Sequence, residues 1–129
     1  MKKTSLPKPT DSELSILRVL WRRGPSTVRQ VVDEINQSQE TGYTTVLKLM
    51  QIMLEKGLLR RDDTERSHVF EATLAEEETQ RQLVGHLLER AFAGSAHQLV
   101  LRALSAQKTT REELAEIRKL LDEMEGGSG

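Results

Sequence analysis

The sequence predicts a mainly α-helical fold with one small β-hairpin, and three observations lead to this prediction. Apolar residues recur at helical spacing in three segments between Thr10 and Lys56. A short stretch after Gly57 changes to a period of two, and helical spacing returns from Glu76 onward. The 129 residues are enough for one domain or two small ones.

The first helix is predicted to begin after Thr10, because Thr10 and Glu13 have the spacing of a capping box. Gly24 and Pro25 end it, since glycine readily adopts the left-handed cap conformation and proline cannot continue the helix. Trp21 continues the apolar stripe, which favours a place in the core over a base-stacking role. The other apolar residues at helical spacing are Leu14, Leu17 and Leu20.

Two further short helices are predicted before residue 57. The first covers about 27 to 36 and starts with a second capping pair, Thr27 and Gln30. The next covers Tyr43 to Lys56 and ends at Gly57. The apolar stripes are Val28, Val31, Val32 and Ile35 on the earlier helix, and Val46, Met50, Met53 and Leu54 on the later one.

A hairpin is predicted next, with strands at roughly 59 to 62 and 67 to 71, because Val69 and Phe70 are typical of strands. The remainder is helical again, and Thr110 with Glu113 forms a third capping pair. Its apolar stripes are Leu83, Leu87, Leu88 and Phe92; Leu99, Val100, Ala103 and Leu104; and Leu114, Ile117, Leu120, Leu121 and Met124. We therefore expect one domain at 1–75, a helical domain at 76–125 and a flexible tail at 126–129.

Several classes of function are disfavoured by what the sequence lacks. Without cysteine there is no disulfide, thiolate zinc site or cysteine nucleophile. His68, His86 and His97 have no ligand spacing, so neither a metal nor a cofactor is expected. No phosphate loop or nucleophile motif indicates an enzyme. No apolar run approaches the roughly 20 residues of a membrane span, and the basic N-terminus precedes no hydrophobic segment, so a cytoplasmic protein is expected.

The net charge of −1 conceals an asymmetry between the two halves. Residues 1–70 hold 12 Lys and Arg against 9 Asp and Glu, a net charge of +3. Residues 71–129 hold 7 against 11, a net charge of −4. This split suggests that the first half meets a polyanion while the second does something else.

Three short helices followed by a hairpin is the order of a winged helix-turn-helix, whose third helix can enter the major groove of DNA. Four polar residues fall away from the apolar stripe of that helix: Thr44, Thr45, Lys48 and Gln51. The threonines lie at its beginning, where recognition helices meet base edges. The alternative is that any surface helix has a polar face. Tyr43 either donates a hydrogen bond to a phosphate or packs at the turn.

The hairpin adds a second candidate contact surface. Arg66 is the favoured contact with phosphate or a narrow minor groove, together with His68, while Arg60 and Arg61 are left open. Three acidic residues interleave with them, Asp62, Asp63 and Glu65, so the alternative is a charged turn that pairs with itself.

Three stretches together resemble the penicillinase-repressor family of bacterial transcription regulators, the BlaI/MecI group: PTDSELSILRVLWRRGPSTVRQVVDEI, GYTTVLKLMQIMLEKGLL and HVFEA. The resemblance extends from about Leu6 to Met124. It implies an N-terminal winged helix and a C-terminal helical segment that pairs two subunits, giving a homodimer on a palindromic operator. It also implies that Thr44, Thr45 and Lys48 contact DNA and that the protein is a repressor.

Two departures from the family concern the inducing signal. The best-known members are cut by a membrane sensor-protease, an inducing partner, at an Asn-Phe bond in the dimerisation segment. Here the only asparagine is Asn36, and Phe92 follows Ala91, so cleavage at that dipeptide is excluded. Copper-responsive relatives carry a C-terminal cysteine cluster that this chain lacks. The signal is therefore left open, and a β-lactam response is not assumed.

The apolar stripes of the second half call for a partner, because three amphipathic helices with few aromatics are poorly placed to form a core of their own. The residues expected to dimerise are Leu83, Leu87, Leu88, Phe92, Leu99, Val100, Leu104, Leu114, Ile117, Leu120 and Leu121. The alternative is that the stripes pack onto the winged helix of the same chain. A protein-interaction adaptor on this scaffold is the alternative function, and a small-molecule sensor is a third.

Overall fold

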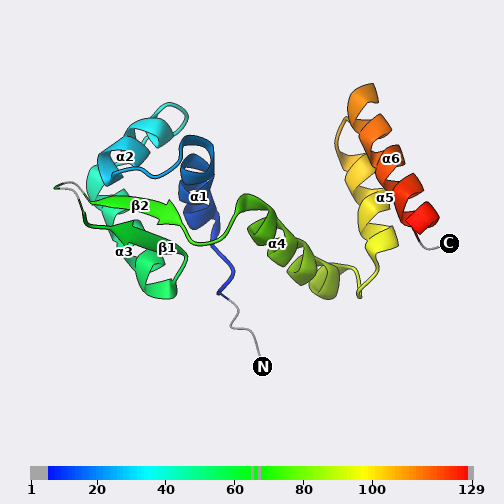
Figure 1. Ribbon diagram of the computed structural model, residues 1–129, viewed down its shortest axis with the longest axis horizontal. Helices are drawn as coiled ribbons and strands as arrows, with labels where there is room; N and C mark the ends of the chain where they lie inside the picture. Colours follow the sequence, from blue (N-terminus) through cyan, green and yellow to red (C-terminus); the bar gives the residue numbers. More distant parts are fainter. Residues whose placement is uncertain (1–5, 65, 67, 128–129) are drawn as a thin grey trace. The chain divides into compact units, whose positions relative to one another are not determined.

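The computed structural model describes residues 6–127 except 65 and 67, and it confirms the mainly α fold with a small hairpin. The first three helices are α1 (Asp11–Arg23), α2 (Val28–Asn36) and α3 (Tyr43–Lys56), followed by the hairpin (Figure 1). Their bounds follow the predicted ones closely, with Thr27 serving as the N-cap of α2 rather than its first residue.

Local capping fixes the ends of these helices as predicted. The Thr10 hydroxyl accepts from the Glu13 amide at 3.2 Å, and the Glu13 carboxylate accepts from the Thr10 amide at 2.9 Å. Thr27 and Gln30 repeat the arrangement at the start of α2. Gly57 closes α3 in the left-handed region at φ 86°, where a side chain would be strained.

The hairpin pairs β1 (Leu59–Asp62) with β2 (Val69–Ala72) in antiparallel register, with Leu59 opposite Ala72 and Arg61 opposite Phe70. The second strand was predicted at 67–71; it begins at Val69 and ends at Ala72, and residue 67 lies outside the described residues. Ser26 adds a bridge to Phe70 through two backbone hydrogen bonds of 3.0 and 2.8 Å, which ties the hairpin to the α1–α2 connection.

The hydrophobic core lies among α1, α2, α3 and the base of the hairpin. Its buried side chains are Ile16, Leu17, Val19, Leu20, Val28, Val31, Val32, Val46, Met50, Met53, Leu58, Leu59 and Phe70. Trp21 packs against this core, as predicted, and its indole N–H donates to the Leu74 carbonyl at 3.0 Å. The core therefore fixes α3 with one face inward and the other exposed.

The contacts of the chain divide it into two units, one ending at Val84 and the other beginning at Gly85. The division expected from sequence followed residue 75. The difference lies in α4 (Glu76–Ala91), whose first turns belong with the winged helix: Thr79 is buried, and the Gln82 amide donates to the Leu6 carbonyl at 2.6 Å.

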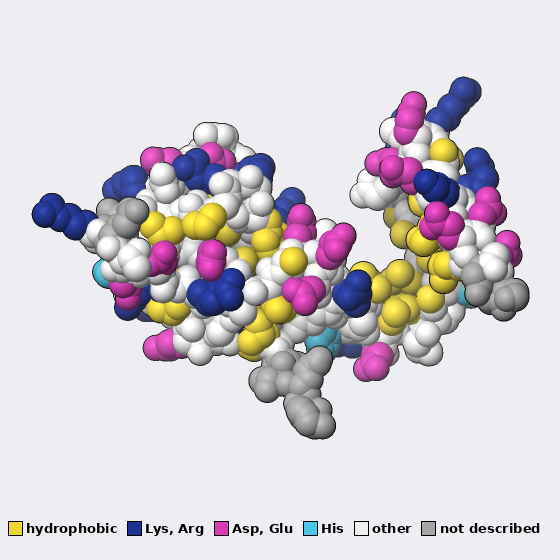
Figure 2. Space-filling view, in the orientation of Figure 1, with side chains coloured by type: hydrophobic (Ala, Val, Ile, Leu, Met, Phe, Trp, Pro, Cys, Tyr) yellow, Lys and Arg dark blue, Asp and Glu magenta, His cyan; other side chains and the backbone are white. Residues whose placement is uncertain are grey.

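The second unit contains the end of α4, α5 (Ala96–Ala106) and α6 (Arg111–Gly127). No described residue of α5 or α6 is buried, and hydrophobic side chains lie on the surface of this unit (Figure 2). α6 includes Gly126 and Gly127, so the helix extends into the expected tail, whose last two residues lie outside the described ones. Within the described part of the chain, each helix is too short or too polar to cross a bilayer.

Candidate nucleic-acid interface

Helix α3 presents the predicted polar residues on one exposed face. Val46, Met50 and Met53 anchor the opposite face in the core. The residues left exposed are Thr44, Thr45, Lys48 and Gln51. Thr44, Lys48 and Gln51 follow the i, i+4, i+7 spacing of a single helix face, so their hydrogen-bonding groups can meet a row of base edges together.

Tyr43 begins this helix, and its ring is covered by an arginine that the sequence analysis did not single out. The guanidinium carbon of Arg29 lies 4.9 Å from the ring centroid, which is a cation–π contact. Tyr43 itself is 41% exposed. Arg29 occupies the first turn of α2, and only the packing of α2 on α3 brings it to the ring, so no local sequence signal marks it.

Some arginines of the hairpin form ion pairs with carboxylates of the same hairpin, and another does not. Asp63 accepts from Arg61 at 2.9 Å and lies 2.7 Å from Nδ1 of His68. Arg60 pairs with Glu71 at 3.2 Å. Arg66 has no ion pair with any residue that the structure describes. Part of this turn therefore pairs with itself, as one of the two alternatives expects, and Arg66 is left without such a pair among the described residues.

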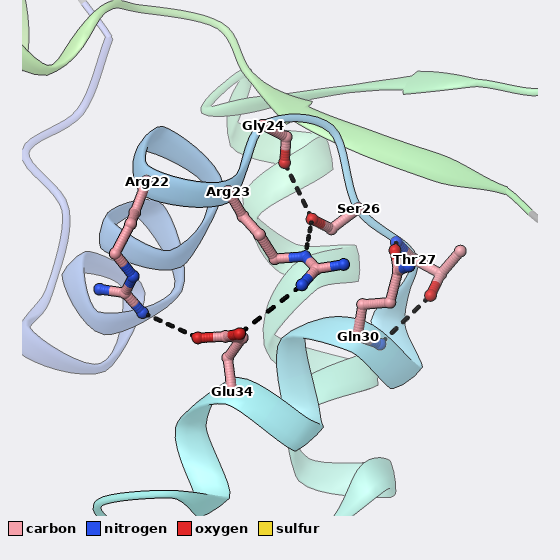
Figure 3. Close-up of polar contacts among 7 residues, drawn as sticks. All are labelled: Arg22, Arg23, Gly24, Ser26, Thr27, Gln30 and Glu34. Atoms are coloured by element: carbon pink, nitrogen blue, oxygen red, sulfur yellow. Dashed lines mark hydrogen bonds and ion pairs between the residues drawn. The ribbon is translucent and has the colours of Figure 1, made fainter.

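The basic end of α1 is also neutralised within the protein (Figure 3). Arg22 and Arg23 both reach the carboxylate of Glu34 on α2, at 3.1 and 3.6 Å. Arg23 donates in addition to the Ser26 hydroxyl at 3.2 Å, and that hydroxyl donates to the Gly24 carbonyl at 2.8 Å. These contacts hold the α1–α2 connection in place, and the two arginines are structural in this unit.

A groove runs between the start of α2, the hairpin and the side of α3 that carries Tyr43, Leu47, Gln51 and Leu54. Its volume is about 520 Å³. Polar and cationic side chains along it are Thr27, Arg29, Tyr43, Gln51, Arg61, Arg66 and His68, and apolar ones are Val28, Leu47, Leu54 and Phe70. Of the predicted contact residues, the fold thus brings Tyr43, Gln51, Arg66 and His68 to one groove. Thr44, Thr45 and Lys48 are not part of its lining.

The far end of α3 is anchored by an ion pair between a partly exposed lysine and a buried carboxylate. Nζ of Lys56 donates to Oε2 of Glu13 at 2.7 Å, and the Glu13 side chain is 2% exposed. Burial raises the pKa of Glu13, but hydrogen bonds from Lys56 and the Thr10 amide outweigh it, so this pKa lies below its ordinary value of 4.5. Glu13 therefore remains ionised and fixes α3 against α1.

The residues expected to dimerise are partly or largely exposed, as an unpaired surface requires. Leu87, Val100, Leu120 and Leu121 are each between 45% and 54% exposed. Leu83 precedes the division of the chain and lies in the first unit, and the other ten lie in the second.

Three helices, a hairpin wing and an exposed polar third helix beside a groove lined with arginines define a winged helix-turn-helix protein of the nucleic-acid-binding class. Comparison with known families gives a match to the penicillinase repressor family over residues 9–123. The chain belongs to this family of transcriptional repressors.

Relatives are similar over nearly their whole length. The penicillinase repressor of Bacillus licheniformis is 24% identical over 95% of this chain and 94% of its own. The transcriptional regulator BlaI of Mycobacterium tuberculosis is 28% identical over 92% and 86%. The methicillin resistance regulatory protein MecI of Staphylococcus aureus is 16% identical over 88% and 92%.

Two solved structures share the fold of the winged helix. The monomeric form of Bacillus licheniformis BlaI in complex with the blaP half-operator matches with a TM-score of 0.51 and 20% identity, covering 57% of this chain and 90% of that one. The DNA-binding domain of the repressor BlaI matches with a TM-score of 0.50 and 23% identity, covering 60% and 93%.

Proposed function

We propose that the protein is a sequence-specific, DNA-binding transcriptional repressor that acts in the cytoplasm as a homodimer on a palindromic operator. The observation that carries the proposal is the exposed polar face of α3, with Thr44, Thr45 and Lys48 in the first turns of the helix. Threonine hydroxyls and methyls and a lysine ammonium are suited to base edges and phosphates of the major groove. Occupying a promoter in this way would block transcription.

The charge of the winged helix supports this assignment. Lys48 and Arg66 have no ion pair with a described residue, whereas Arg22, Arg23, Arg60 and Arg61 are each held by a carboxylate. Lys48 lies on α3 and Arg66 in the hairpin, the two elements that meet DNA in winged helices. Lys8, Arg18 and Arg81 of the same unit are also exposed without an ion pair to a described residue, so position on these two elements, and not lack of pairing alone, favours Lys48 and Arg66. The relative from Bacillus licheniformis, whose monomeric form is seen on a half-operator, favours one winged helix on each half of the operator.

The homodimer is supported by the exposed apolar side chains of α5 and α6. All the buried hydrophobic side chains of the described chain belong to the first unit, so α5 and α6 have no core of their own. A second copy would cover these leucines, and twofold symmetry would place the two α3 helices on the inverted halves of a palindrome.

The proposal is tested by selecting duplexes from a random library with the full chain at moderate salt and sequencing those retained. An inverted repeat, with half-sites one helical turn or a multiple of it apart, is expected. Sedimentation of the free protein should give the mass of two chains. Retention without any sequence preference would contradict the DNA-reading role, and a monomer at all concentrations would contradict the homodimer.

The inducing signal is constrained by the residues around the α4–α5 turn. If a membrane sensor-protease releases this repressor, it must cut a bond other than Asn-Phe, because Ala91 precedes Phe92 here. Mass analysis of the chain after induction in cells would identify that bond. An intact chain would indicate another signal.

A further inference from the structure

One cationic side chain of the groove beside α3, that of Arg29, is positioned by another residue. The guanidinium of Arg29 lies over the ring of Tyr43 at 4.9 Å, and its ion pair with Asp33 is long, at 4.0 Å, with both side chains about two-thirds exposed. An exposed pair at that distance contributes little. The aromatic ring is therefore the main feature that directs this arginine, and its charge stays available to a ligand.

The lining of the groove has the chemistry of a nucleic-acid backbone. Arg29, Arg61 and Arg66 reach it from α2, β1 and the hairpin turn. Asp63 already pairs with Arg61, so Arg29 and Arg66 are the guanidinium groups left for an anionic ligand. Leu47 and Leu54, both partly exposed, contribute apolar surface beside them. A sugar-phosphate strand offers both partners, because its phosphates suit guanidinium groups and its deoxyribose carbons suit apolar side chains.

We propose that this groove carries the backbone of an operator strand and that Arg29, positioned by the ring of Tyr43, binds one of its phosphates. The inference rests on the proposed function and adds to it a contact on α2. Tyr43 then acts through Arg29, so its ring is needed and its hydroxyl is not. This phosphate contact fixes the position of α3 along the duplex, and it does not itself distinguish one base from another.

The test compares Arg29→Gln with Arg22→Gln in the full chain. Arg22 is a matched control, because its side chain is 62% exposed against 64% for Arg29, but Glu34 already pairs with it. Affinity is measured against salt concentration, both for the duplex recovered by selection and for a random-sequence duplex of equal length. Thermal unfolding of each variant at one protein concentration shows that the fold is kept.

Arg29→Gln is expected to lower the slope of log affinity against log salt by about one on both duplexes, whereas Arg22→Gln leaves it unchanged. Between 50 and 200 mM salt, the wild type should then lose about 3.5-fold more affinity than Arg29→Gln. An unchanged slope with normal binding by the wild type would overturn the inference and leave the proposed function standing. A wild type that binds neither duplex would overturn both.

Variants of Tyr43 separate its ring from its hydroxyl. Tyr43→Phe should bind like the wild type, and Tyr43→Leu should reproduce the reduced slope of Arg29→Gln. Combining Tyr43→Leu with Arg29→Gln should add little to Arg29→Gln alone, because both changes remove the same contact. Weaker DNA binding by Tyr43→Phe would contradict the positioning role. So would a double variant in which the effects of the two single changes on affinity add in full. A changed base preference in Arg29→Gln would make it a base contact and overturn the phosphate assignment.

Discussion

Lys56, the last residue of the candidate recognition helix, donates to a carboxylate of Glu13 that is almost completely buried, with Nζ and Oε2 2.7 Å apart. Glu13 also closes the capping box of α1 through its other carboxylate oxygen. One side chain therefore starts the first helix and anchors the end of the third. The orientation of α3 depends on this pair as well as on the apolar core.

Replacing Lys56 by Met should destabilise the protein more than replacing Glu13 by Gln. Lys56→Met leaves a buried carboxylate without its partner, which costs about 3 to 5 kcal/mol. Glu13→Gln removes the charge but can keep the capping hydrogen bond, so we expect about 1 to 3 kcal/mol. Urea unfolding at one protein concentration measures both. Equal losses in the two variants would show that the buried charge is not the cause.

The contribution of Glu13 to the free energy of unfolding should also depend on pH. Because its pKa in the folded protein lies below 4.5, its ionisation stabilises the fold above the unfolded pKa, and that stability is lost as the pH falls through the folded pKa. The difference in unfolding free energy between the wild type and Glu13→Gln should therefore be larger at about pH 7 than at about pH 3. A difference that does not change with pH would contradict this origin.

Lys48→Ala should weaken DNA binding without loss of stability, because Lys48 is exposed and has no ion pair with a described residue. If Lys48 reaches a base, the preference at one operator position should relax; if it reaches a phosphate, the salt slope should fall by about one. Binding to the selected duplex and its single-base variants separates the two cases. Lys119→Ala, on α6, is the control. Equal DNA affinity of the two variants would show that Lys48 does not contact DNA.

Asp63→Asn should strengthen DNA binding, because the carboxylate of Asp63 holds both Arg61 and His68. Its removal frees a guanidinium that lines the groove and takes away a negative charge near the phosphates. The salt slope of binding should therefore become steeper by about one. Asp122→Asn in α6 removes the same charge from the second unit and should have no effect. Weaker binding by Asp63→Asn would mean that Asp63 orders the hairpin for contact.

The sequence predicted best the helix ends that are set by residues close together in the chain. Thr10 with Glu13, and Thr27 with Gln30, are three residues apart and satisfy each other's backbone groups, so the starts of α1 and α2 were predictable. Gly57 marked the end of α3 because glycine readily adopts the left-handed conformation that ends a helix.

Contacts between elements were not predictable from spacing. Arg29 meets Tyr43 only because α2 packs on α3, and Lys56 meets Glu13 across 43 residues of chain. The contacts divide the chain after Val84 and not after residue 75 for a related reason, since Gln82 of α4 donates to Leu6 near the other end of the first unit. The polar residues of α3 were found because their exposure follows from the apolar period of that one helix.

A charge placed on the exposed apolar surface of α6 should separate the subunits without unfolding the winged helix. Leu121 is 54% exposed in the single chain, so Leu121→Asp costs that chain little, but it would bury an unpaired carboxylate in a dimer. We expect a cost of about 3 kcal/mol, or about a hundredfold weaker association, by sedimentation equilibrium. Lys119→Glu, on another side of the same helix, is the control. DNA affinity should fall on the palindrome but not on an isolated half-site. Unchanged association of Leu121→Asp would place the subunit contact elsewhere.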